Sequence, residues 1–193
     1  MTRTSAECEL SFILRCRDDE ERIGHTIQRI SSHLRGLGLC FELLVVDEGS
    51  GDNTLAVAAL QRRGHAELEV LDAQPGQGFV TGAQRARGRI VVACDVRSEA
   101  PLAALGYALG RLDRGLDVVA LGGRFLVFRR TRALRALDAL ASSRRDPREL
   151  ERRFLRRART LGLLVAITHP RRERILDRLR SVLSVPRSLS FLL

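Results

Sequence analysis

Acidic residues and glycines gather in four short stretches of this 193-residue chain, and each stretch directly follows an apolar run. A carboxylate accepts hydrogen bonds from a nucleobase N–H or a ribose hydroxyl, and a second carboxylate can hold the divalent ion that bridges a diphosphate. Glycine lets the backbone approach a bound group closely. These residue types together predict a site for a nucleotide. The candidates in chain order are Asp18, Asp19, Glu20, Asp47, Gly76, Gly78 and Asp95.

The apolar runs before these stretches are predicted to be strands of one buried, mostly parallel sheet. They cover residues 10–14, 41–46, 68–71 and 89–94, and a fifth run covers 116–121. Helical patterns separate them, such as the recurrence of Ile23, Ile27 and Ile30 at spacings of four and three. Continuous apolar strands that alternate with helices are typical of an α/β fold with helices on both faces of the sheet. Ligands of such folds bind beyond the carboxyl ends of the strands, where the four stretches would meet.

The pattern changes after residue 121. A strand at 122–128 follows through a tight turn, and two arginine-rich helices are predicted at 130–142 and 147–161. One more strand at 163–167 precedes a basic amphipathic helix at 171–183 and an apolar end at 191–193. We therefore expect residues 1–123 to form an α/β core. Residues 124–193 would add the remaining strands and the arginine-rich helices of the same domain.

The net charge of +10 is unevenly distributed along the chain. Residues 1–123 hold 14 arginines and 17 acids, whereas residues 124–193 hold 19 arginines and 6 acids. All 33 basic residues are arginine, which excludes a Schiff-base lysine, a pyridoxal phosphate lysine and a Walker-type phosphate-binding lysine. The arginine excess could reflect the base composition of the genome, and the asymmetry of charge concerns the partners of the chain rather than its fold.

The basic helix at 171–183 is open to two interpretations. It could lie on an anionic membrane surface, or it could pack its leucine face on the sheet and leave its arginines in solvent. Nucleic acid is the less favoured partner, because 7 Phe and 1 Tyr offer no stacking platform among the arginines. A polar N-terminus and the absence of an apolar run of ~20 residues favour a cytoplasmic protein, which the basic helix could bring to a membrane surface. The short helical end makes a homodimer plausible.

The four stretches together resemble the glycosyltransferases of family 2, which have the GT-A fold and use nucleotide sugars. Residues 15–23 read RCRDDEERI where the family has a motif like PAYNEEERI, and residues 45–54 read VVDEGSGDNT where it has VVDDGSTDNT. Residues 76–82 read GQGFVTG, similar to the start of GKGAALRAG, and residues 86–90 read ARGRI, similar to an ARGE or ARGD segment. Residues 124–130, RFLVFRR, resemble a later GFxLFRR segment.

The resemblance implies a role for each candidate. Asp47 would contact the base or ribose, and the acidic run at 18–20 would line the same pocket. Gly76 and Gly78 would let the backbone approach the nucleotide sugar, and Asp95 would hold Mn²⁺ or Mg²⁺ as the first carboxylate of a DxD motif. From the residues alone, Asp47 could instead shape its turn, and the two glycines could mark a plain turn.

The chain departs from the family pattern at three places. The DxD motif is incomplete, because Arg97 stands where its second carboxylate belongs. Arg97 could bind the diphosphate itself, since a planar guanidinium matches phosphate, or the metal site is lost. The acceptor-binding segment that the family carries between the strands at 116–121 and 122–128 is absent. No clear equivalent of the family's catalytic carboxylate is present, and Asp146 and Glu149 are the candidates.

Two functions follow from this resemblance. The leading hypothesis is a compact family 2-like glycosyltransferase that binds a nucleotide sugar, UDP-linked by preference. It would transfer the sugar with inversion to an unknown acceptor, for which a lipid-linked acceptor at a membrane surface is a candidate. The alternative is a catalytically inactive descendant of the fold, which serves as a binding or scaffold module through its basic C-terminal surface.

Overall fold

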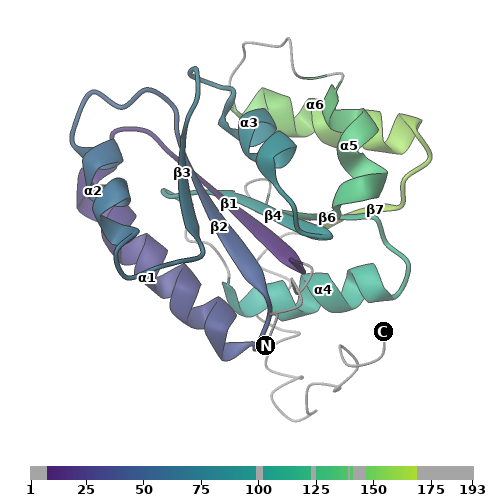
Figure 1. Cartoon of the computed structure of the whole chain (residues 1–193). Helices are drawn as coiled ribbons and strands as arrows, with labels where there is room; N and C mark the ends of the chain where they lie inside the picture. Colours follow the sequence, from purple (N-terminus) through teal and green to yellow (C-terminus); the bar gives the residue numbers. More distant parts are fainter. Residues whose placement is uncertain (1–7, 99–101, 123–124, 139, 141–146, 169–193) are drawn as a thin grey trace.

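The computed structural model describes residues 8–98, 102–122, 125–138, 140 and 147–168. Within these ranges, seven strands form one sheet between two layers of helices (Figure 1). The strands are β1 (Leu10–Cys16), β2 (Phe41–Asp47), β3 (Leu68–Asp72), β4 (Ile90–Asp95), β5 (Val118–Leu121), β6 (Phe125–Arg129) and β7 (Val165–Thr168). The helices are α1 (Glu20–Gly36), α2 (Thr54–Gln61), α3 (Gly78–Arg85), α4 (Leu105–Asp113), α5 (Arg130–Asp138) and α6 (Pro147–Thr160), with a 3-10 turn at Leu102–Ala104.

The strand order across the sheet is β3-β2-β1-β4-β6-β5-β7. β1 pairs in parallel with β2 and β4, and β2 pairs in parallel with β3. β6 runs antiparallel to both β4 and β5, whereas β7 is parallel to β5. The short connection from β5 to β6 accounts for this reversal, because a parallel crossover needs a dozen or more residues. The carboxyl ends of β1, β2, β3 and β4 consequently meet at one edge of the sheet.

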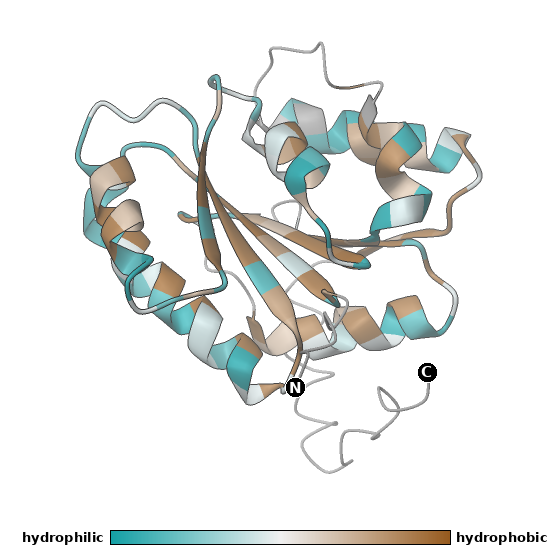
Figure 2. Cartoon of the chain, in the orientation of Figure 1, coloured by the Kyte–Doolittle hydropathy of each residue, from teal (hydrophilic) through white to brown (hydrophobic). Residues whose placement is uncertain are grey.

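Side chains of alternate residues fill a hydrophobic core on each face of the sheet. One core joins β1 residues such as Phe12 to apolar residues of α1, α2 and α4. The other joins Ile13 to apolar residues of α3, α5 and α6, with Phe79, Phe128 and Phe154 in mutual ring contact. Figure 2 shows the apolar strands as a brown layer between helices of mixed colour. The burial of the strands on both faces explains why their sequences read as unbroken apolar runs.

Every strand and helix predicted up to residue 168 is confirmed, with ends that differ by a few residues. The largest difference is the helix predicted at 130–142, because α5 ends at Asp138. The predicted basic helix at 171–183 and the apolar end at 191–193 lie outside the described residues. Among the helices that the structure describes, none has the length and apolar character needed to cross a membrane.

Candidate functional site

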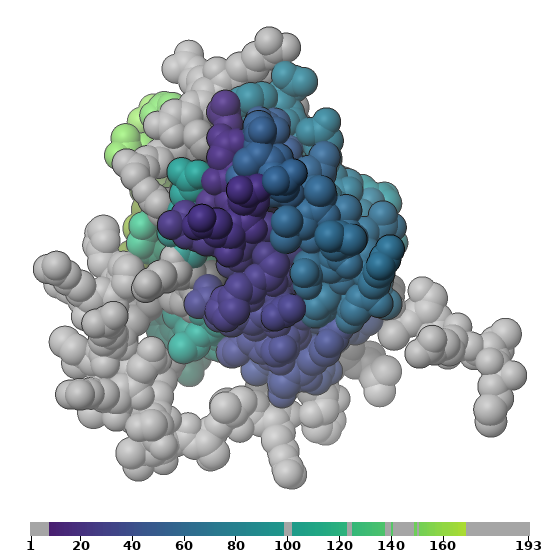
Figure 3. Space-filling view, turned by 90° about the vertical axis from the view of Figure 1, so that its left-hand side faces the viewer, coloured from purple at the N-terminus to yellow at the C-terminus, as the bar shows by residue number. Residues whose placement is uncertain are grey.

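The segments that follow β1 and β2 lie side by side at the carboxyl edge of the sheet, which faces the viewer in Figure 3. Backbone hydrogen bonds to side chains join the two segments. The Asp18 N–H donates to Ser50 Oγ over 3.0 Å, and the Gly51 N–H donates to Asp18 Oδ1 over 2.7 Å. Asp18 is the one non-glycine residue with a positive φ (52°) in the described part of the chain. This strained backbone is held in place by the contacts with the segment after β2.

The first turns of α1 and α2 cap each other. The Glu20 N–H donates to Asp52 Oδ2 over 3.1 Å, while Glu20 Oε2 accepts from the Asn53 N–H and amide at 3.0 and 2.9 Å. Each carboxylate therefore satisfies an N–H group that the start of the other helix leaves open. Glu20, which was predicted to line the ligand pocket, is engaged in this reciprocal cap.

Asp47 is buried at the end of β2, with 3% of its surface exposed. Its Oδ2 accepts from the Ser50 N–H over 3.0 Å, and its Oδ1 accepts from the Ser50 hydroxyl. The Cys16 thiol lies 3.7 Å from the same Oδ1. Burial, together with the negative charges of Asp47 and Asp19, raises the pKa of Cys16 far above its ordinary value, so the thiol stays protonated. Asp47 thus shapes its turn, and only its Oδ2, which accepts one hydrogen bond, retains a lone pair for a ligand.

The side chain of Glu48, which follows β2, reaches the first residue of α3. This contact was not predicted from the sequence. Its Oε1 accepts from the Gly78 N–H over 2.7 Å, and the carboxylate is buried. A Cβ at Gly78 would lie 2.5 Å from that oxygen, so glycine is required there by Glu48 itself. Gly76 has a positive φ of 80°, which a side chain disfavours. Two features of the sequence could have indicated this contact. Glu48 is a second acid directly after Asp47, and the glycine-rich turn that ends at Gly78 follows thirty residues later.

Arg97 ties the segment after β4 to the segment after β1. Its backbone N–H donates to Asp95 Oδ1 over 2.8 Å, and its Nε donates to Asp19 Oδ1 over 2.9 Å. Its Nη2 donates to the carbonyl oxygens of Arg17 and Asp18 at 2.9 and 3.0 Å. The hydrogen bond and charge of Asp19 raise the pKa of Arg97 above its ordinary value. Asp19, predicted as a pocket residue, is a buried carboxylate neutralised by Arg97.

The described residues at this edge do not fit a divalent metal held by a DxD motif. Asp95 is half-buried and is the only carboxylate of the pair, since Arg97 takes the other position. Across the described residues, no group of three His, Cys, Asp or Glu side chains is arranged to hold a metal ion. A guanidinium also places a positive charge where a cation would have to sit.

The two carboxylates predicted as catalytic candidates have different outcomes. Asp146 lies outside the described residues, whereas Glu149 is half-buried in the first turn of α6. The neighbouring acid Glu151 is buried and pairs with Arg15 of β1 over 3.0 Å, with side-chain exposures of 6% and 4%. Arg15 is the register partner of Asp95 on β4. An arginine inside an otherwise apolar strand was the signal that a buried partner exists.

Comparisons with known proteins agree with this architecture. The family model described as "Glycosyl transferase family 2" matches residues 11–182. An undecaprenyl-phosphate 4-deoxy-4-formamido-L-arabinose transferase from Enterobacter sp. (strain 638) is 27% identical over 150 residues, which are 74% of this chain and 46% of the relative. A transferase of the same name from Pseudomonas paraeruginosa is 30% identical over 115 residues, 57% of this chain and 34% of the relative. The chain spans less than half the length of these curated relatives.

Solved structures of low sequence identity share the fold. A mannosyltransferase from Pyrobaculum calidifontis, in complex with GDP-Man and Mn²⁺, has a TM-score of 0.63 at 16% identity and covers 84% of this chain and 55% of its own. Glucosyl-3-phosphoglycerate synthase from Mycobacterium tuberculosis, in complex with Mn²⁺, UDP and glucosyl-3-phosphoglycerate, has a TM-score of 0.63 at 17% identity and covers 95% and 82%. The predicted GT-A arrangement is therefore confirmed.

Proposed function

Because the chain belongs to glycosyl transferase family 2, we propose that it binds a nucleotide sugar, UDP-linked by preference, at the carboxyl edge of β1 to β4. The observation that carries the proposal is the convergence of the segments after β1, β2 and β4 on one edge. These segments place the carboxylates of Asp18 and Asp95 near the guanidinium of Arg97, and Asp47 lies buried at the end of β2. Carboxylates suit the N–H and hydroxyl donors of a base and ribose, and a guanidinium suits a diphosphate.

Donor binding on this site is independent of a divalent metal. The Nε and Nη2 groups of Arg97 are engaged, but its Nη1 has no hydrogen-bond partner among the described residues. The side chain is 53% exposed, so a diphosphate can approach it from solvent. Gly76 lies in the turn after β3 at the same edge, and its lack of a side chain leaves room for the sugar there, whereas the buried Gly78 N–H is already taken by Glu48.

The proposed acceptor is a lipid monophosphate of the kind named in the curated relatives. In the transfer, an acceptor oxygen forms a bond to the anomeric carbon while the bond to the diphosphate breaks, and the nucleoside diphosphate leaves with inversion. A phosphate monoester is largely dianionic at neutral pH, with a second pKa of about 6. Such an acceptor needs no protein carboxylate to remove a proton. The excess of arginine in residues 124–193 favours an anionic acceptor of this kind.

The test is thermal stabilisation of the full chain by UDP-, GDP-, dTDP- and CMP-sugars, each with and without Mn²⁺. At a hundredfold excess over Kd, a ligand of the native state stabilises it by about 2.7 kcal/mol. We expect a shift with one nucleotide that does not require Mn²⁺ and that falls in Arg97→Gln. Arg29→Gln, an exposed arginine of α1, is the matched control for the loss of one charge.

Two outcomes of this panel would contradict the proposal. A shift that appears only with Mn²⁺ would show that a metal, rather than Arg97, holds the diphosphate. No shift with any nucleotide sugar would show that the edge does not bind a donor.

A second candidate function is a binding or scaffold module that has lost transfer. It is favoured by the connection of residues 122–124 between β5 and β6, which leaves no room for an acceptor-binding segment. Incubation with the nucleotide sugar identified above and a polyprenyl phosphate separates the two candidates. Formation of a glycosylated lipid phosphate supports the transferase, and donor binding without product supports the module.

A further inference from the structure

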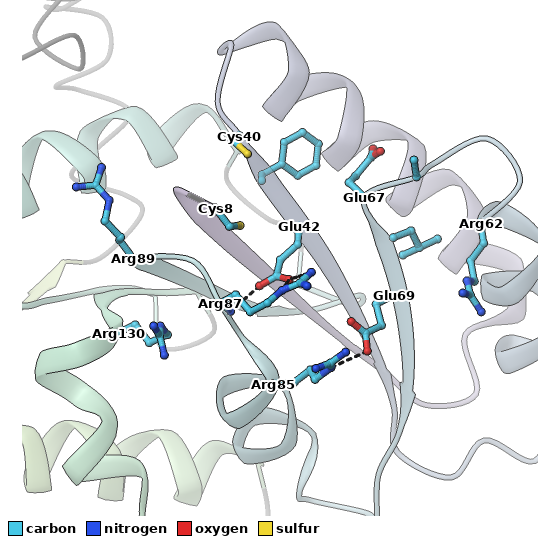
Figure 4. A pocket seen from close by; sticks show the side chains of 13 residues that line it. Cys8, Cys40, Glu42, Arg62, Glu67, Glu69, Arg85, Arg87, Arg89 and Arg130 are labelled. Carbon is cyan, nitrogen blue, oxygen red and sulfur yellow. Dashed lines mark hydrogen bonds and ion pairs between the residues drawn. The ribbon is translucent and has the colours of Figure 1, made fainter. Parts of the chain in front are cut away.

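A cavity of about 820 Å³ lies at the opposite edge of the sheet from the candidate donor site. Its wall includes the first residues of β2 and β3 and the residue before β4, so it sits at the amino ends of these strands. Its volume lies within the range of small-molecule sites, about 300–1,000 Å³. Figure 4 shows that arginine and glutamate side chains dominate the wall. The described arginines of the wall are Arg62, Arg85, Arg87, Arg89 and Arg130.

Two of these arginines are neutralised by glutamates of the same wall. Arg87 binds Glu42 through Nε and Nη2 at 2.8 and 2.7 Å, and its backbone N–H also donates to this carboxylate. Arg85 Nε binds Glu69 over 2.7 Å. The third glutamate, Glu67, pairs with an arginine of α1 at 2.7 Å.

The remaining three arginines of the wall have no carboxylate partner among the described residues. Arg89 and Arg62 are exposed, and Arg130 is half-buried with its Nε donating to the Gly88 carbonyl over 3.0 Å. All the wall glutamates are already paired, so the cavity holds uncompensated positive charge. In Figure 4, Arg89 and Arg130 lie at one side of the cavity and Arg62 at the other.

The backbone holds Arg89 and Arg130 as neighbours. The Arg130 N–H donates to the Arg89 carbonyl over 2.9 Å, directly beyond the antiparallel pair of Ile90 and Arg129. Like charges that face each other across antiparallel strands are destabilising, unless a counterion lies between them. The sheet thus fixes the backbones of two arginines side by side at the cavity wall, and a guanidinium without a carboxylate partner suits phosphate oxygens.

We propose that this cavity binds a phosphorylated ligand, whose anionic groups are held by Arg62, Arg89 and Arg130. The polar wall excludes an apolar ligand. A soluble phosphate compound and the headgroup of an anionic lipid share this chemistry. The site is separate from the donor site, because the two lie at opposite edges of one sheet.

The test is a titration of the full chain and of its Arg97→Gln variant with inorganic pyrophosphate. Arg97 belongs to the proposed donor edge and does not line the cavity, so pyrophosphate binding that persists in Arg97→Gln reports on the second site. We expect saturable binding that weakens about tenfold or more in Arg62→Gln/Arg89→Gln, since each loss removes charge-assisted hydrogen bonds. Neither arginine has a partner to lose in the described residues, so the double variant is expected to fold, which circular dichroism checks. Arg156→Gln/Arg157→Gln, which replaces two exposed arginines of α6 outside the cavity wall, is the matched control.

A parallel arm uses flotation with vesicles of phosphatidylglycerol in phosphatidylcholine, against phosphatidylcholine alone. Vesicle binding that is lost in the double variant, with weak pyrophosphate binding, identifies a lipid headgroup as the source, and the reverse identifies a soluble phosphate. The proposal is overturned if the wild-type chain binds neither probe, or if the double variant binds both as the wild type does. A separate measurement of UDP binding in Arg97→Gln distinguishes failure of this site from failure of the donor site, because Arg97 does not line the cavity.

Discussion

Arg15 and Glu151 form a buried ion pair. Among replacements of one charged side chain, we expect the loss of either partner to lower the free energy of unfolding most. Arg15 Nη2 lies 3.0 Å from Glu151 Oε1, and the two side chains are 4% and 6% exposed. Arg15 Nε has no hydrogen-bond partner among the described residues, so the carboxylate is its main compensation. Breaking such a pair from one side costs about 3–5 kcal/mol, because a charge stays buried without its partner.

Glu151→Gln keeps the shape of the side chain and removes the charge opposite Arg15. We expect its free energy of unfolding, from urea titration at pH 7, to fall by about 3–5 kcal/mol. In a chain of this size each kcal/mol corresponds to roughly 2–4 °C in Tm, so a thermal scan gives an independent reading. Arg15→Met should lose a similar amount.

The double variant Arg15→Met/Glu151→Met should recover most of the loss, since apolar replacement of a whole buried pair is often neutral or stabilising. The control is Glu149→Gln, which alters a half-buried acid one half-turn away and should change stability by less than about 0.5 kcal/mol. The reasoning from burial would be refuted if each single variant lost less than about 1 kcal/mol and the loss in the double variant equalled the sum of the two. The pair would then not be energetically coupled.

Three further predictions concern other parts of the fold. Gly88→Ala should lower the free energy of unfolding, measured by urea titration, by about 1–3 kcal/mol or more, because the new Cβ would lie 2.4 Å from the backbone N of Ser11 in β1. Gly110→Ala in α4, where a Cβ would meet no atom within 4 Å, should raise it by about 0.5–1 kcal/mol. Burial raises the pKa of Glu42, but hydrogen bonds from a serine hydroxyl and an arginine outweigh it and hold this pKa below its ordinary value of 4.5. Its stabilisation is therefore present above pH 4.5 and lost as the pH falls through the folded pKa, so the stability difference between wild type and Glu42→Gln should shrink from pH 6 to pH 3. Burial raises the pKa of Cys94 to about 12, so iodoacetamide at pH 8 should modify exposed Cys40 and spare Cys94, as peptide mass spectrometry would show; equal labelling would contradict this.

The arginine at position 97 changes both the metal-binding motif and the contacts of the segment after β1. Where the family motif has a second metal-binding carboxylate, this chain has a guanidinium that neutralises Asp19 and holds the segment after β1. Arg97→Asp would rebuild the DxD motif in sequence, but it would also leave the buried Asp19 facing another negative charge. The variant is therefore expected to lose stability rather than to gain Mn²⁺ binding, which a thermal scan with and without Mn²⁺ checks.

The sequence by itself determined the elements of the fold and their order. Apolar runs and helical spacings are local patterns, and they located every strand and helix up to residue 168. Because parallel strands end at a common edge, the same patterns also predicted that the stretches beginning near Asp18, Asp47 and Asp95 would converge there.

Only the tertiary structure decided which charged groups meet. The pair of Arg15 and Glu151 is separated by 136 residues, and the pair of Asp19 and Arg97 by 78. No local pattern links such positions, since their contact depends on strand order and on the helix that packs over a given face. The same reason hid the arginine-lined cavity, where Arg89 and Arg130 become neighbours only through the antiparallel pairing of β4 and β6.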